Sequence, residues 1–152
     1  MKVETFADLI HWTRAVHHRL AECLEHCANE TDQGLAKLLL SYLADHEATL
    51  EKIVDGFENR ADPKALHTWV YDYLGHEPID PHRACDKPFA SMTFDEICKS
   101  VFELHSQVTS LYRYLVGRAE IPEARELLQA LLDMEEHETM RLAQQTNRIR
   151  DM

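Results

Sequence analysis

Four long stretches of this sequence repeat apolar residues at steps of three and four, the spacing that gathers them on one face of an α-helix. The pattern predicts helices over about 5–27, 32–57, 93–116 and 122–148. In the first stretch, the apolar stripe runs through Leu9, Val16 and Leu20. A helix with a single apolar face buries that face against its neighbours. The sequence therefore predicts an all-α bundle of four helices.

Signals at the ends of these stretches support the predicted limits. Thr5 and Thr93 each stand before an acidic first turn and can cap the free amides there. Pro122 occupies a first-turn position, where a missing amide hydrogen breaks no helical bond. The chain has only four Gly and five Pro residues, and their scarcity favours long uninterrupted helices over a turn-rich β fold.

The links between the predicted helices differ greatly in length. Residues 28–31 and 117–121 form short links, and short links make antiparallel neighbours. The middle link, 58–92, is far longer and holds a predicted short helix over Pro63–Leu74, followed by a loop rich in Pro and His. We therefore expect one domain over 1–152, made of two helical hairpins joined by a long crossover.

The two predicted hairpins look like copies of each other, 88 residues apart. Apolar matches arise easily between any two amphipathic helices, whereas polar matches on the apolar face do not. The polar matches pair His17 with His105 and Glu47 with Glu135. A rival register, 91 residues apart, pairs His46-Glu47 with His137-Glu138.

Four polar residues fall within the apolar stripes rather than opposite them: His17, Glu47, His105 and Glu135. Each stands near the middle of its helix, so a bundle of antiparallel hairpins would place the four in one layer. A buried carboxylate without a partner is strongly destabilising, and two that face each other need a cation, shared protons or water. Imidazole and carboxylate ligands together suit iron, manganese or zinc. Glu138, one turn beyond Glu135, also points inward and is a candidate fifth ligand.

With these residues placed, the chain resembles the ferritin-like superfamily, the four-helix bundles that include rubrerythrin. In that family, helices 1 and 3 each supply a Glu and helices 2 and 4 each supply Glu-x-x-His, and together these hold two irons or manganeses. This chain keeps the Glu of each Glu-x-x-His at Glu47 and Glu135. It departs from the family's pattern at His17, Leu50, His105 and Glu138. The resemblance implies a bound transition metal with iron foremost, chemistry with oxygen or peroxide, and a homodimer; the altered ligand set implies one ion, or a pair with more water ligands.

Two other interpretations stay open. Buried His and Glu can form a hydrogen-bonded polar layer that fixes the helix register without metal, and the chain would then act as an interaction or oligomerisation module. A hemerythrin-like site needs several His at fixed helical spacings, and the nearest candidates are His46 and His137. We expect His137 to face solvent, and His46 and Glu51 to lie at the edges of their apolar stripe.

Charge and composition narrow the range of partners. The chain has 16 Lys and Arg against 27 Asp and Glu, a net charge of −11. An acidic chain repels phosphate backbones and anionic lipid, so we expect neither nucleic acid nor membrane as a partner. No apolar run approaches the roughly 20 residues that span a bilayer, and residues 1–10 lack the apolar segment of a signal peptide, which predicts a cytoplasmic location. The sequence contains no Gly-rich phosphate loop and no nucleophile elbow. It therefore gives no support to a nucleotide-binding protein or a hydrolase.

The cysteines and the crossover carry further predictions. The four cysteines have no regular zinc spacing, and we expect thiols rather than disulfides in a reducing compartment. A zinc ion could be bound in the crossover by His76, His82 and Cys85, although their spacing fits no strong motif. A predicted lid over the bundle, or alternatively a dimer contact, consists of Leu66, Trp69, Val70 and Tyr73.

Overall fold

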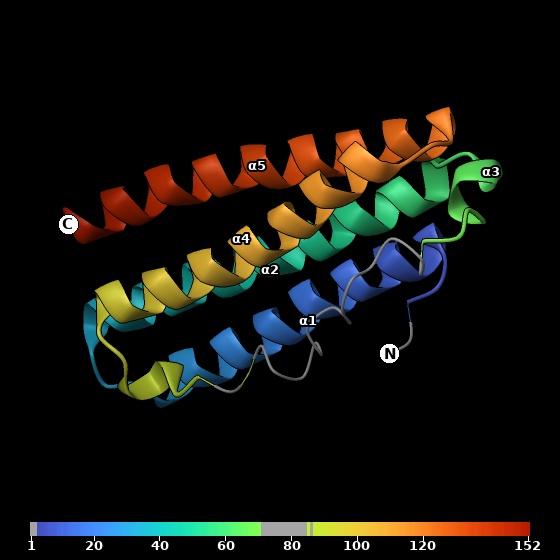
Figure 1. The fold of residues 1–152 in the computed structure, drawn as a ribbon. Helices are drawn as coiled ribbons and strands as arrows, with labels where there is room; N and C mark the ends of the chain where they lie inside the picture. The colour runs from blue at the N-terminus through green and yellow to red at the C-terminus, as the bar shows by residue number, and fades with distance from the viewer. Residues whose placement is uncertain (1–2, 71–84, 86) are drawn as a thin grey trace.

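The computed structural model describes residues 3–70, 85 and 87–152, and its long helices lie side by side (Figure 1). The elements are α1 (Phe6–Glu30), α2 (Gly34–Arg60), α3 (Pro63–Leu66), η3 (Phe89–Ser91), α4 (Phe94–Arg118) and α5 (Pro122–Arg150). Within the described residues the sole β pairing is an isolated bridge between Thr5 and Trp69, so the all-α prediction is confirmed. None of the helices in this part of the chain combines the length and apolar character needed to cross a membrane.

The four long helices form where the apolar stripes predict them. Thr5 and Thr93 each begin a helix with a capping box, in which the threonine side chain and an acidic side chain satisfy each other's backbone amides. The second long helix begins at Gly34, two residues after its predicted start, with Gln33 as its N-cap. Each helix also runs slightly past its predicted end. Ala28, beyond the predicted end of α1, is only 3% exposed, so packing holds the added turn.

The predicted crossover helix over Pro63–Leu74 is wrong from His67 to Val70, because α3 ends after four residues; residues 71–74 lie outside the described residues. An antiparallel bridge between Thr5 and Trp69 draws the backbone out of the helix. The Val70 amide donates to the Glu4 carbonyl oxygen at 2.7 Å. These contacts join the segment to the residues before α1, a long-range pairing that a local sequence pattern does not reveal.

The bundle consists of two antiparallel hairpins, α1 with α2 and α4 with α5 (Figure 1). The second helix ends beside α3 at one end of the bundle, and α4 begins beside η3 at the other end. One long connection therefore returns the chain from the first end to the second, so α2 and α4 run in the same direction. This is the predicted arrangement, and it is confirmed.

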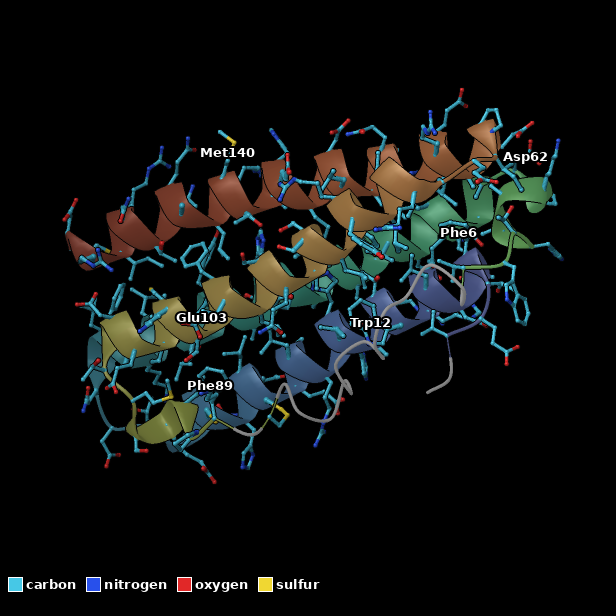
Figure 2. The ribbon with its side chains drawn as sticks, viewed as in Figure 1. Phe6, Trp12, Asp62, Phe89, Glu103 and Met140 are labelled. Carbon is cyan, nitrogen blue, oxygen red and sulfur yellow. A yellow bond between two sulfur atoms is a disulfide. The ribbon has the colours of Figure 1, made fainter. Side chains whose placement is uncertain are left out.

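A layer of polar side chains divides the buried core into two apolar clusters. One cluster lies at the α3 end and contains Phe6, and the other lies at the η3 end and contains Phe89 (Figure 2). Along α1, His17 falls between Val16 of the first cluster and Leu20 of the second. Similar changes of cluster occur along the other three long helices, so the polar layer lies at mid-height of the bundle.

Candidate metal centre

Each long helix contributes one side chain to this polar layer. The four are His17 from α1, Glu47 from α2, His105 from α4 and Glu135 from α5. Their exposed fractions are 1%, 0%, 2% and 0% respectively. The structure thus brings together, at one depth in the bundle, the four residues that the sequence places within the apolar stripes.

Glu47 bridges the two histidines of the layer. His17 Nδ1 donates to Glu47 Oε2 at 2.5 Å, and His105 Nε2 donates to Glu47 Oε1. On the opposite side, His17 Nε2 donates to Glu135 Oε1 at 2.8 Å. His105 Nδ1 and Glu135 Oε2 lie 3.9 Å apart, beyond hydrogen-bonding distance. The four side chains therefore form a ring that hydrogen bonds close on three sides and leave open on the fourth.

The open side leaves two buried polar atoms, His105 Nδ1 and Glu135 Oε2, without a hydrogen-bond partner. A buried polar atom that has lost its bonds to water destabilises the fold by about 1–3 kcal/mol. Such atoms in a folded protein call for a bound ion, a water or a chemical role. The open side is therefore the place where the layer can accept a further group.

The layer favours the protonated form of both histidines when no cation is bound. Burial lowers the pKa of His17, but the carboxylates of Glu135 and Glu47 outweigh burial and raise it to about 10. The same balance raises the pKa of His105, where burial is opposed chiefly by Glu47. Burial raises the pKa of Glu47, but His105 and His17 outweigh it and lower that pKa well below its usual range. Two imidazolium rings facing two carboxylates make the buried layer neutral overall.

Tyr112 closes the layer toward the α3 end. It is 0% exposed, as is Thr13, and the two hydroxyls are hydrogen bonded to each other. The Thr13 hydroxyl also donates to the Leu9 carbonyl oxygen at 3.0 Å, so Tyr112 donates the bond that the pair shares. Burial raises the pKa of Tyr112, and the nearby Glu135 carboxylate raises it further. A neutral hydroxyl pair therefore seals this side of the layer.

Comparison with known proteins bears on the fold. Neither a protein-family model nor a curated protein sequence matches the chain. Among solved structures, that of a provisionally assigned ferritin-like diiron-carboxylate protein from Thermotoga maritima aligns with a TM-score of 0.58, over 94% of this chain and 95% of that chain. The chain has the ferritin-like fold. At 13% sequence identity, this likeness shows the fold alone.

The polar layer of this ferritin-like bundle fits a divalent metal ion on its own chemistry. One ligand atom each from His17, Glu47 and His105 can be chosen so that all three lie within 4.8 Å of one another. An ion about 2.0–2.2 Å from each nitrogen or oxygen could bind all three after small side-chain shifts. An ion of charge +2 would also replace the two ring protons without changing the net charge of the buried layer. A metal ion and the ring protons would therefore compete for the same imidazole nitrogens.

The other polar residues singled out in the sequence lie outside this ring. Glu138 is 7% exposed, and its Oε1 accepts from Arg141 Nη1 at 3.2 Å. His46 is half-buried; its Nε2 has no hydrogen-bond partner, and burial lowers its pKa. As predicted, His137 is exposed, which removes it from any site inside the ferritin-like bundle. Glu51 lies at the helix edge and accepts from His18 Nδ1 at 2.9 Å.

The prediction that all the cysteines are thiols is wrong for one pair. Cys23 and Cys85 form a disulfide, with their Cα atoms 5.7 Å apart across a sequence separation of 62. The crossover brings Cys85 alongside α1, a proximity that sequence spacing does not reveal. Because its sulfur is bonded, Cys85 cannot serve as the thiolate of a zinc site. Cys27 and Cys98 are free.

Part of the predicted lid is present at the α3 end. Val70 is fully buried, whereas Trp69 is 48% exposed. Leu66 is partly buried against the apolar cluster of that end. Three predicted residues of the crossover, Tyr73, His76 and His82, lie outside the described residues.

Two residues in and around the layer are not recognised from the sequence. From the sequence, Tyr112 is an ordinary member of the α4 apolar stripe, although a hydroxyl two helical turns after the inward His105, on the same face, is a usable signal. Arg141 carries no signal by itself. It gains a role only through its position three residues after Glu138, where a helix brings the two side chains together.

Proposed function

We propose that this protein binds a transition metal ion at the polar layer, held by His17, Glu47, His105 and Glu135, with iron foremost and manganese or zinc as alternatives. The observation that carries the proposal is a fully buried set of two imidazoles and two carboxylates in which His105 Nδ1 and Glu135 Oε2 have no partner. The fifth candidate from the sequence, Glu138, is paired with Arg141 at the rim of the layer, and we propose for it a role in metal uptake rather than as a lasting ligand. The chain would act as one domain, in the cytoplasm and in a homodimer.

The residues of the layer would divide the work of holding the ion. Glu47, which already contacts both histidines, would keep the two rings facing the same point. His17 and His105 would give up their ring protons and offer nitrogen lone pairs. Tyr112 and Thr13 would exclude water from the α3 side. A redox-active ion such as iron, when bound there, supplies chemistry with oxygen or peroxide.

A second candidate function rests on the same hydrogen bonds. Three of the four possible contacts in the ring are already made, so the layer can be a neutral, largely satisfied polar network without metal. Such a network fixes helix register and specifies a unique fold. The protein would then be an interaction or oligomerisation module.

Metal analysis of protein purified without an affinity tag or chelator separates the two. The metal proposal predicts close to one equivalent of a transition metal, or two for a pair, after reconstitution. Less than about 0.2 equivalents of any transition metal would contradict it.

The paired substitution of His105→Leu with Glu135→Leu provides a second test. If the layer binds metal, the variant loses the rise in melting temperature that added metal gives the natural protein. If the layer is only a polar network, metal has no effect on either protein, and the apolar variant is as stable or more stable.

A further inference from the structure

The two sides of the polar layer, taken along the bundle axis, differ in character. Toward the α3 end, the side chains of Tyr112 and Thr13 are fully buried, and their hydroxyls are hydrogen bonded to each other. Their hydroxyls are committed, and the apolar cluster of that end lies beyond them. Beyond these committed hydroxyls, a hydrated ion would meet the apolar side chains of that cluster.

Toward the η3 end, polar side chains continue outward from the layer between α2 and α5. They are Tyr42, His46, Glu138 and Arg141, which we call the seam cluster. The ring of His46 lies 6.5 Å from that of His105 and 6.1 Å from that of Tyr42. Glu138 is paired with Arg141, whose side chain is 64% exposed. The seam cluster therefore extends from the layer to solvent.

The inner members of the seam cluster carry atoms able to bind a cation. Glu138 is 7% exposed, although Met140, two residues later, points outward from α5 and is 64% exposed (Figure 2). His46 Nε2 is buried without a hydrogen-bond partner. In the layer itself, His105 Nδ1 and Glu135 Oε2 are likewise without a hydrogen-bond partner. Carboxylate oxygen and imidazole nitrogen are shared ligands of iron, manganese and zinc.

We propose that a divalent cation reaches the polar layer through the seam cluster, where Glu138 captures it and His46 passes it to the open side of the layer. This rests on the proposed metal-binding function and assigns the path to the same site. Glu138 follows Glu135 by one turn on α5, and on α2 the ring of His46 lies 6.5 Å from that of His105. The net charge of −11 draws cations toward the protein in general, and the seam cluster gives them a point of capture.

Arg141 covers this path. Its guanidinium Nη1 lies 3.2 Å from Glu138 Oε1, and its positive charge repels an arriving cation. The arginine side chain is 64% exposed, so it can swing into solvent when a cation displaces it. Removing Arg141 should therefore speed metal uptake, whereas removing the charge of Glu138 should slow it.

The test measures Co²⁺ uptake by the metal-free protein in a stopped-flow instrument, followed by the visible absorption of bound Co²⁺. The variants are Glu138→Gln and Arg141→Gln. The matched controls are Glu136→Gln and Arg113→Gln, which alter a second Arg–Glu pair with exposed fractions of 43% and 61%. Each control makes the same change in net charge away from the seam cluster.

We expect Glu138→Gln to lower the uptake rate constant about tenfold and Arg141→Gln to raise it several-fold. Both should keep the wild-type Co²⁺ stoichiometry at saturation, and both controls should stay near the wild-type rate. A variant that merely disturbs the fold would not change the uptake rate in opposite directions at the two partners of one ion pair.

Three results would overturn this path. One is an unchanged rate in Glu138→Gln, and another is an equal slowing in Glu136→Gln. The third is a lower saturating stoichiometry in Glu138→Gln, which would make Glu138 a ligand of the bound ion instead. If the wild-type protein takes up no Co²⁺ at all, the metal-binding function itself fails, and that outcome is distinct from the other three.

Discussion

His17 and Glu135 stand 118 residues apart in the chain, yet His17 Nε2 lies 2.8 Å from Glu135 Oε1. The other nitrogen of the same ring donates to Glu47, so carboxylates hold this histidine from two sides. An imidazole that donates from both nitrogens carries a positive charge. That charge governs the stability of the metal-free protein and its exchange of protons for metal.

We predict that the metal-free protein loses stability as the pH rises from about 6.5 to about 10. Burial opposes the charged ring, but Glu135 and Glu47 outweigh it and raise the pKa of His17 from 6.5 to about 10. A group that holds its proton more tightly when folded stabilises the fold fully below its unfolded pKa, and this stabilisation disappears as the pH passes the folded pKa. Urea unfolding at about pH 6 and about pH 10 measures the difference.

His17→Gln is the control for this pH dependence, because its side chain cannot be protonated. Its free energy of unfolding should fall less over the same interval, since only the general titration of the chain remains. An equal fall in the variant and the natural protein would show that His17 does not carry the effect.

Metal binding should release protons. The pKa of His17 is raised to about 10 and that of His105 is raised as well, so the metal-free layer favours protonated rings, and nitrogen ligands must lose those protons to bind an ion. We predict the release of at least one proton for each divalent ion, from His17, and an apparent affinity that rises about 10-fold or more per pH unit near neutrality. Titration with Zn²⁺ in weakly buffered solution with a pH indicator measures the release. Binding without proton release would place the ion at some other site.

The helices and their inward residues could be predicted from sequence because both depend on local rules. Helical spacing places His17 on the buried face of α1, and capping at Thr5 and Thr93 fixes two helix starts. The long crossover follows from link lengths alone. Each of these properties is set by residues within a few turns of each other.

The remaining features depend on contacts that are distant in sequence. The crossover helix is shorter than predicted because Val70 pairs with the backbone before α1, and Cys23 meets Cys85 across 62 residues. Spacing also indicates which face a side chain occupies but not its rotamer. It therefore could not foresee that Glu47 bridges both rings while Glu135 bonds only one. The unpartnered atoms of the layer arise from that difference.

We predict that Glu47→Gln strongly destabilises the metal-free protein and abolishes its stabilisation by metal. The substitution leaves two buried imidazolium rings without the carboxylate that joins them. Breaking a buried ion pair from one side costs about 3–5 kcal/mol. Urea unfolding and the melting temperature with and without added metal measure the two effects.

The matched control is Glu51→Gln, one turn further along α2. Glu51 pairs with the exposed His18 at 2.9 Å, so its loss should change stability by about 1 kcal/mol or less and leave metal binding intact. Comparable losses in both variants would argue against a special role for Glu47.

Tyr112→Phe should lower stability by about 1 kcal/mol, as expected for one lost neutral hydrogen bond. The loss is small because the Thr13 hydroxyl keeps its bond to the Leu9 carbonyl oxygen, so no buried donor is orphaned. Metal stoichiometry should not change, since the tyrosine seals the layer without being one of its proposed ligands. Tyr114→Phe, at a site 42% exposed, serves as the control and should behave like the natural protein in urea unfolding. A fall in metal content in Tyr112→Phe alone would instead place that hydroxyl within the metal site.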